Sequence, residues 1–199
     1  RQMCIRDRNP ISRIEVASAG GYLSYENIAD KATVAGVEVE VRKNLFVRPL
    51  SSAANGMNKL SFGLNGSYIY TNAKMPLATV TTGSQLEGAA PWIANFDLSH
   101  NFTKGTHSFI NTLVFNYVSD KIYTIGTQGY QDIIEQGMMT LDFVSQAKLN
   151  KYVSLTLKAR NLLNPSYKLS RKANESGEKV VLSDYKKGIN ISLGVSCTF

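Results

Sequence analysis

The sequence is short of charge, histidine and cysteine, and each shortage excludes a class of protein. Only 19% of the 199 residues are charged, and no apolar run reaches the roughly 18 residues that a membrane-crossing helix needs. The two cysteines, Cys4 and Cys197, are too few for a disulfide framework. The two histidines have no metal-ligand spacing around them. No Ser/His/Asp group, paired-carboxylate site or Gly-rich phosphate loop can be recognised. We therefore expect no enzyme activity, no catalytic residue, no metal and no cofactor.

The net charge of +7 suggests a nucleic-acid partner at first sight. The basic residues are, however, scattered through the chain rather than gathered in one patch or on one helix, which is the usual signature of such a partner. We therefore expect no nucleic acid.

What the chain does have is alternation, most clearly in its last residues. Between residues 189 and 199 every odd position is apolar and every even position is small or polar, and the run ends on the aromatic Phe199. This period of two predicts a strand with one apolar face and one polar face. A soluble protein rarely leaves such a strand at its terminus, whereas the last strand of an outer-membrane barrel closes the sheet against another strand and leaves no edge in lipid.

Seven further segments alternate in the same way, which gives about eight strands. They lie at residues 13–17, 36–42, 60–71, 92–99, 108–117, 139–146 and 153–160. The expected connections differ in length on the two sides. Short turns fall at 103–107 and 149–152, and long polar connections fall at 20–31, 72–90, 126–136 and 168–184. The connection 47–58 is long for a turn. Short turns on one side and long loops on the other are typical of a bacterial outer-membrane barrel.

The charged residues of these strands fall on the polar face, which we expect to line a watery lumen. They are Glu38, Glu40, Arg42, Asp97, Asp142, Lys158 and Arg160, and Arg13 and Glu15 share this register. Alternation alone does not say which face points outward, because a soluble barrel buries its apolar face. The terminal aromatic, the aromatics at strand ends and the unequal loops favour the membrane alternative.

The first residues do not fit this pattern. Residues 1–8 carry three arginines, do not alternate and lack the apolar core of a signal peptide. We expect residues 1–10 to be a leader outside the barrel, with residues 1–8 foreign to the fold, and residues 11–199 to be the strands. We also expect the chain to be the back end of a longer protein.

Three stretches resemble TonB-dependent outer-membrane receptors. Residues 33–40, which contain Gly36-Val37-Glu38-Val39-Glu40, are similar to the family's Gly-Val-Glu-x-Glu strand. Residues 160–167 resemble the family's Asn-Leu-hydrophobic-Asn-x-x-Tyr stretch, and residues 188–199 resemble its closing strand. The likeness covers about residues 11–199. It implies an all-β, antiparallel transmembrane β-barrel, of which this chain supplies the C-terminal portion; the full barrel would have about 22 strands.

The resemblance also implies function, location and partners. It implies active uptake of a bulky nutrient (siderophore-bound iron, a cobalamin-like compound or a glycan) across the outer membrane of a Gram-negative cell. The implied partners are outer-membrane lipid, a TonB-type energy-coupling complex acting through a plug, and the barrel-assembly machinery, which would read Phe199. The extracellular ligand stays unknown. The residues expected to touch it are Lys74, Gln85, Glu87, Tyr123, Gln128, Tyr130, Gln131, Lys168 and Arg171.

Two other functions stay open at this point. The chain could be a complete eight-stranded anchor or adhesin barrel without transport, because about eight strands fill their own interior. It could also be a soluble, lipocalin-like binder, which would stay in water without detergent.

Overall fold

Eight strands form one antiparallel sheet, which we call the wall. The computed structural model describes residues 2–16, 22–27, 29–50, 56–74, 85–127, 129–173 and 177–198. The wall has the order β1-β4-β5-β6-β7-β10-β11-β14. Its strands are β1 (Gln2–Arg8), β4 (Lys31–Leu50), β5 (Gly56–Lys74), β6 (Trp92–Lys104), β7 (His107–Val118), β10 (Met138–Lys148), β11 (Val153–Arg160) and β14 (Asn190–Cys197). Within the described residues no helix is long and apolar enough to cross a membrane.

Six shorter strands form two smaller sheets. A hairpin pairs β2 (Ile11–Glu15) with β3 (Leu23–Asn27). A four-stranded sheet has the order β13-β12-β9-β8. Its strands are β8 (Lys121–Thr124), β9 (Ile133–Glu135), β12 (Ser166–Lys172) and β13 (Lys179–Lys186). The expected long connections at 126–136 and 168–184 therefore contain strands of their own.

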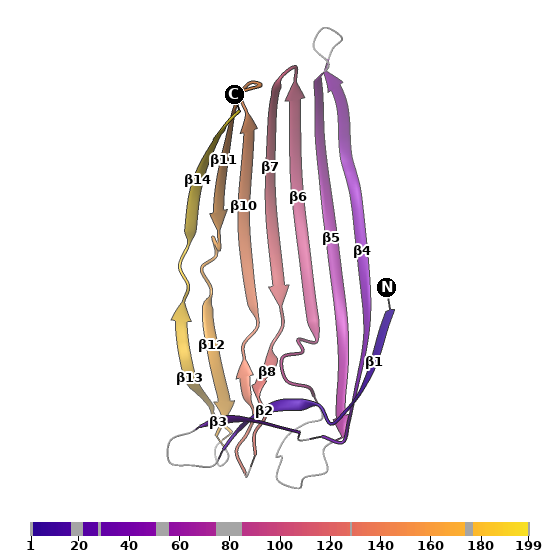
Figure 1. Cartoon of the computed structure of the whole chain (residues 1–199), viewed down its shortest axis with the longest axis vertical. Helices are drawn as coiled ribbons and strands as arrows, with labels where there is room; N and C mark the ends of the chain where they lie inside the picture. Colours follow the sequence, from indigo (N-terminus) through magenta and orange to yellow (C-terminus); the bar gives the residue numbers. More distant parts are fainter. Residues whose placement is uncertain are drawn as a thin grey trace.

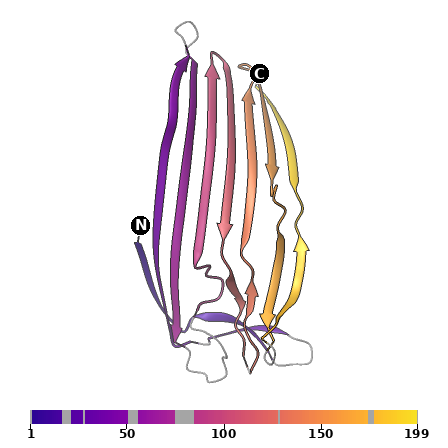
Figure 2. The ribbon, with the colours of Figure 1, turned by 180° about the vertical axis from the view of Figure 1, so that it is seen from behind.

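The two ends of the wall differ (Figures 1 and 2). All the short strands gather at one end, which we call the loop end, while β14 finishes at the opposite end, the turn end. β12 and β13 continue the directions of β11 and β14 beyond the wall, and β2 lies across the strand ends. The described strand ends that flank the four long connections all lie at the loop end, as expected. The connection expected at 47–58 is shorter than predicted, because β4 reaches Leu50 and β5 begins at Gly56.

Strand register separates an apolar face of the wall from a polar one. Directly paired residues in antiparallel strands point to the same side of a sheet. Tyr68 pairs with Trp92, and their ring centroids lie 4.5 Å apart. Leu157 pairs with Leu193 on the same kind of face. Leu193 is 71% exposed, so within the described residues nothing covers this apolar face.

Among the described residues, the buried core lies at the loop end and not behind the wall. Ile14, Ile122 and Ile125 form one cluster, with Ile134 packed against it. Ala32 and Ala73, at the loop-end termini of β4 and β5, belong to a second. A soluble sheet of this size would cover its apolar face with other elements. The exposed apolar wall is instead what a lipid-facing surface requires.

The first expected strand and the expected leader need correction. We expected residues 13–17 in the barrel, but Ile11–Glu15 form β2 in the hairpin at the loop end. Residues 2–8, expected outside the sheet, form β1 and pair with β4 over the register Gln2↔Val37 to Arg8↔Lys31. An edge strand is held by backbone hydrogen bonds on one side and needs no alternation for them. Whether residues 1–8 are native to the protein stays a prediction.

Candidate functional site

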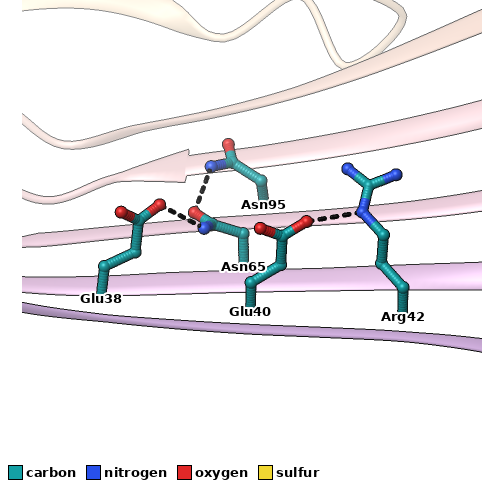
Figure 3. A network of polar contacts seen from close by, with 5 residues as sticks. All are labelled: Glu38, Glu40, Arg42, Asn65 and Asn95. Atoms are coloured by element: carbon teal, nitrogen blue, oxygen red, sulfur yellow. Dashed lines mark hydrogen bonds and ion pairs between the residues drawn. The ribbon is translucent and has the colours of Figure 1, made fainter. Parts of the chain in front are cut away.

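A chain of hydrogen bonds crosses the polar face of the wall from β4 to β6 (Figure 3). Asn65 Nδ2 donates to Glu38 Oε1 at 2.7 Å, and Asn95 Nδ2 donates to Asn65 Oδ1 at 3.3 Å. Beside them, Arg42 Nε donates to Glu40 Oε1 at 2.5 Å. Register produces this alignment, because Asn65 pairs with Glu40 on one side and with Asn95 on the other.

The same row continues across two more strands. Asn95 pairs with Asn116, and Asn116 pairs with Thr140. Asn116 Nδ2 donates to Thr140 Oγ1 at 3.2 Å. We call Asn65, Asn95 and Asn116 the asparagine row. An amide side chain both donates and accepts, so it can bond to neighbours on both sides of its own strand.

Asp97 lies next to this row, opposite a glycine. Gly63 pairs with Asp97, and a β carbon at Gly63 would come within 2.3 Å of Asp97 Oδ1. The missing side chain therefore leaves the room that the carboxylate occupies. Glu38, Glu40, Arg42 and Asp97 line one hollow of about 360 Å³. Four of the residues expected on the lumen side thus gather in one place on the polar face.

The β2–β3 hairpin is fixed to the loop end through its backbone and its core residue. Ile125 donates its backbone N–H to Arg13 O at 3.1 Å, and the Thr127 hydroxyl donates to Glu15 O at 2.7 Å. Ile14 lies between these contacts and is only 5% exposed. A segment between β1 and β4 in sequence is thereby anchored beside β8, across the strand ends (Figure 1).

Two arginines fasten this hairpin to its surroundings. Arg13 Nη2 lies 3.3 Å from Glu87 Oε1, and its guanidinium carbon lies 4.3 Å from the centroid of the Tyr123 ring. Burial alone would lower the pKa of Arg13, but a hydrogen bond with Tyr25 and the charge of Glu87 outweigh burial and raise it. Arg13 is therefore held as a cation.

The second arginine, Arg171, comes from β12. Arg171 Nη2 donates to Glu15 Oε2 and forms an ion pair with it, and the Arg171 guanidinium lies 5.5 Å from the ring centroid of Tyr130. Arg13 and Glu15 are two positions apart on β2 and so share one face of the strand. Both Arg–Glu pairs consequently hold the same strand face.

The structure places the expected ligand residues unevenly. Glu87 and Tyr123 contact Arg13, Arg171 contacts Glu15, and Tyr130 lies against Arg171. Lys168 instead pairs with Asp184, with Nζ and Oδ2 3.2 Å apart. Gln85 and Gln131 lie at the loop end, and neither side chain forms a hydrogen bond or ion pair within the described residues. The Lys74 side chain, Gln128 and Phe199 lie outside the described part of the chain.

Sequence reasoning missed the partners Arg13 and Glu15, which it assigned to the barrel wall. They lie 74 and 156 residues from Glu87 and Arg171. The available signal was the polar, turn-rich stretch that follows residue 16, which marks a short hairpin as readily as a wall strand.

A bend interrupts the last two strands of the wall. Asn161 and Asn164 both have positive φ, of 59° and 45°, as does Gly188 at 83°. Asn161 Nδ2 donates to Gly188 O at 2.7 Å, and the Gly188 N–H donates to Asn164 Oδ1 at 3.1 Å. The Asn161 N–H donates to Asp142 Oδ1 at 2.8 Å. The bend between β11 and β12 is thus tied to the bend between β13 and β14.

A second hollow, of about 400 Å³, opens beside this bend, and we call it the bend hollow. Its lining residues come from β10, β11, β12, β14 and the two bends: Met138, Thr140, Asp142, Arg160, Asn161, Pro165, Tyr167, Lys187, Gly188 and Asn190. Asp142 and Arg160 were expected on the lumen side. Lys158 lies two positions before Arg160 on β11 and pairs with Ser192 on the same face.

Tyr167 closes one side of the bend hollow. Its hydroxyl donates to Glu135 Oε2 at 3.3 Å, and its ring lies 5.0 Å from the ring of Tyr185, centroid to centroid. Burial raises the pKa of Tyr167 to about 12, and the charge of Glu135 adds to the effect. The residues that the structure describes include no group of three or more His, Cys, Asp or Glu side chains able to hold a metal ion.

Comparison with known proteins gives one match. A family model described as "TonB dependent receptor-like, beta-barrel" matches residues 5–162. No curated protein and no solved structure matches the chain. The matched segment runs from within β1 to the bend after β11, and so includes six of the eight wall strands whole and part of β1.

Proposed function

This chain belongs to the TonB-dependent receptor-like β-barrel family, and we propose from that membership that it forms the C-terminal wall of an outer-membrane receptor for the active uptake of a bulky nutrient. Membership implies the outer membrane, a lipid environment and a TonB-type partner. The finer proposal concerns the cargo, which we take to be a siderophore-bound iron, a cobalamin-like compound or a glycan.

The observation that carries this proposal is the contrast between the two faces of one sheet. Val39 on the apolar face is 60% exposed, while Asn65 and Asn95 on the other face are joined by hydrogen bonds. A sheet with an uncovered apolar face is stable where hydrocarbon surrounds it. A connected polar face is stable where water or another polar surface covers it. The interior of a plugged barrel provides such a cover, because both water and the plug are polar.

Each part of the chain has a role in such a receptor. The asparagine row and the charges around Arg42 would contact the plug, to which the energy-coupling complex connects from the inner membrane. The loop end, with Tyr130 and Arg171, would meet the nutrient from outside. Phe199 would be read by the barrel-assembly machinery, as many barrels of this kind end on an aromatic residue.

The alternative of a complete eight-stranded anchor has less support. A closed barrel of eight strands would pair β1 with β14, but these strands form the two edges of the wall. Unpaired edges of this length in lipid leave backbone groups without partners. Further strands between β14 and β1 would satisfy both edges, as in a larger barrel. The same uncovered apolar face also opposes a soluble binder.

The test is uptake by the intact receptor with and without its energy source. The gene would be expressed in a Gram-negative host that lacks its own receptors for ferric citrate, cyanocobalamin and maltoheptaose. We expect growth on one of the three, and loss of that growth when the TonB-type protein is deleted. Growth that survives the deletion, or a folded outer-membrane receptor that supports none of the three, would contradict the proposal.

A further inference from the structure

We propose that the bend hollow binds an anionic group, a carboxylate or a phosphate ester, attached to a ring or other apolar body of the transported nutrient. This inference rests on the proposed function and narrows its substrate class. The hollow opens on the polar face, where β10 begins and β11 ends, which is the loop end of the wall. Its volume of about 400 Å³ lies within the range of small-molecule sites.

The charges around the hollow favour an anion. Arg160 and Lys187 both line it, and within the described residues neither forms an ion pair. Arg13 and Arg171 at the same end of the molecule are each paired with a glutamate. An incoming carboxylate or phosphate would give the two cations of the hollow an ion-pair partner, which the described residues do not supply.

The one carboxylate in the hollow offsets at most one of these two cations. Asp142 Oδ1 accepts the backbone N–H of Asn161 at 2.8 Å, so this oxygen is occupied by the bend. Arg160 pairs in register with Asn190, a neutral residue that also lines the hollow. Two cations therefore face one engaged carboxylate, and the local balance is positive.

The remaining lining is suited to a ring. Met138, Pro165 and Tyr167 supply apolar surface. The hydroxyl of Tyr167 is engaged with Glu135, and Lys187 Nζ lies 5.6 Å from the centroid of the Tyr167 ring. A ligand ring beside Tyr167 would place its acidic substituent near Lys187 and Arg160. Aromatic contact and charge would then act on the same molecule.

The experiment measures binding of simple probes to the intact, detergent-solubilised receptor by calorimetry. Phenyl phosphate and benzoate carry a ring and an anion, whereas benzyl alcohol has the ring without the charge. We expect phenyl phosphate, benzoate or both to bind and benzyl alcohol to bind at least about tenfold more weakly. Binding of only one acid identifies the phosphate or the carboxylate as the recognised group. Failure of both acids to bind, or equal binding of the alcohol, would overturn the inference.

Variants locate the binding. The double variant Arg160→Gln/Lys187→Gln should weaken binding of the acid by about tenfold or more. The matched control Lys172→Gln/Lys179→Gln removes two exposed lysines that pair across β12 and β13 outside the hollow, and it should leave the affinity unchanged. The variant Arg160→Lys/Lys187→Arg keeps both charges and should retain most of the binding, which separates loss of charge from misfolding. Equal losses in the first variant and the control would refute the assignment.

This assay contains no energy source, so it is independent of transport. If no probe binds but growth still depends on the TonB-type protein, the inference falls and the proposed function stands. If the probes bind but growth survives deletion of the TonB-type protein, the inference stands and the proposed function falls.

Discussion

Asn161 and Gly188 fix each other across the bend, although 27 residues separate them. Asn161 Nδ2 donates to the Gly188 carbonyl at 2.7 Å, and both residues have positive φ. Asparagine suits this position for two reasons, because it tolerates the left-handed region and its amide reaches the neighbouring strand. Glycine would meet only the first requirement and alanine neither.

Substitutions at Asn161 should therefore rank in order. Asn161→Gly removes the hydrogen bond and should cost about 0.5–1.5 kcal/mol of unfolding free energy. Asn161→Ala adds the cost of a left-handed conformation, about 1–2 kcal/mol more. Urea unfolding of the receptor in detergent would give both values. Alanine that is no worse than glycine would show that the backbone conformation of Asn161 does not matter to stability.

Two glycines should respond differently to alanine. At Gly63 the new β carbon meets the end of the Asp97 side chain, which can rotate away, so Gly63→Ala should cost less than about 1 kcal/mol. At Gly126 it would lie 2.1 Å from the backbone oxygen of Tyr130, which cannot move alone. We expect Gly126→Ala to cost several kcal/mol or to prevent folding of the loop end. Heat-modifiable gel mobility with thermal unfolding would compare them, and equal stability of the two variants would contradict this account.

Charge placed on opposite faces of β14 should have unequal effects. Leu193 pairs with Leu157 on the apolar face, and Ser192 pairs with Lys158 on the polar face. If the apolar face lies at the middle of the bilayer, Leu193→Arg should cost about 2–4 kcal/mol. Ser192→Arg, in water beside Lys158, should cost well under half of that. Folding into lipid vesicles of the intact receptor measures both, and similar costs would reverse or abolish the assignment of faces.

The fastening of the β2–β3 hairpin can be tested by local proteolysis. Arg13→Gln removes the ion pair with Glu87 and the contact with the Tyr123 ring. These side chains are partly exposed, so the loss should be about 1 kcal/mol and cleavage at Tyr25 by chymotrypsin should accelerate about fivefold. Lys179→Gln, on exposed β13, is the control. Unchanged cleavage in Arg13→Gln would show that the ion pair does not hold the hairpin.

The phenol of Tyr167 should titrate late and should link stability to high pH. Its pKa is raised from 10.0 to about 12 in the folded protein, first by burial and then by Glu135. The neutral phenol therefore contributes its full stability below about pH 10, and that contribution is lost as the pH rises through about 12. The difference in tyrosinate absorbance between wild type and Tyr167→Phe should show this midpoint, and Glu135→Gln should lower it. A midpoint near 10 in the folded receptor would contradict this environment.

The alternation of apolar and polar residues located most strands of the wall, but not its edge strand β1. The segments around Val39, Phe96 and Leu193 form β4, β6 and β14 as expected. The alternation around Ile14 led to the wrong assignment of residues 13–17 to the wall. A small sheet that covers a local core also has one solvent-exposed face and one buried face. Residues 2–8 pair with β4 through backbone groups, which leave no mark on the sequence.

The sequence placed several candidate ligand residues at the loop end, but it did not indicate their partners. The polar, aromatic-rich connections correctly suggested Tyr130 and Arg171 as loop-end residues, yet nothing local to them indicates Glu15. The strands of the four-stranded sheet are only 3–8 residues long, too short for a period to be read with certainty. The bend at Asn161 and Asn164 leads from the wall into β12, and its hydrogen bonds reach across to Gly188.

The location of the buried core divides this molecule between two solvents. Ile122 and Ile125 are buried by other protein atoms at the loop end, whereas Leu193 on the wall is not covered by any described residue. Urea weakens burial of apolar side chains away from water, whereas removal of detergent or lipid takes away the hydrocarbon that covers the wall. We therefore expect the loop end to respond first to denaturant and the wall to respond first to removal of detergent or lipid.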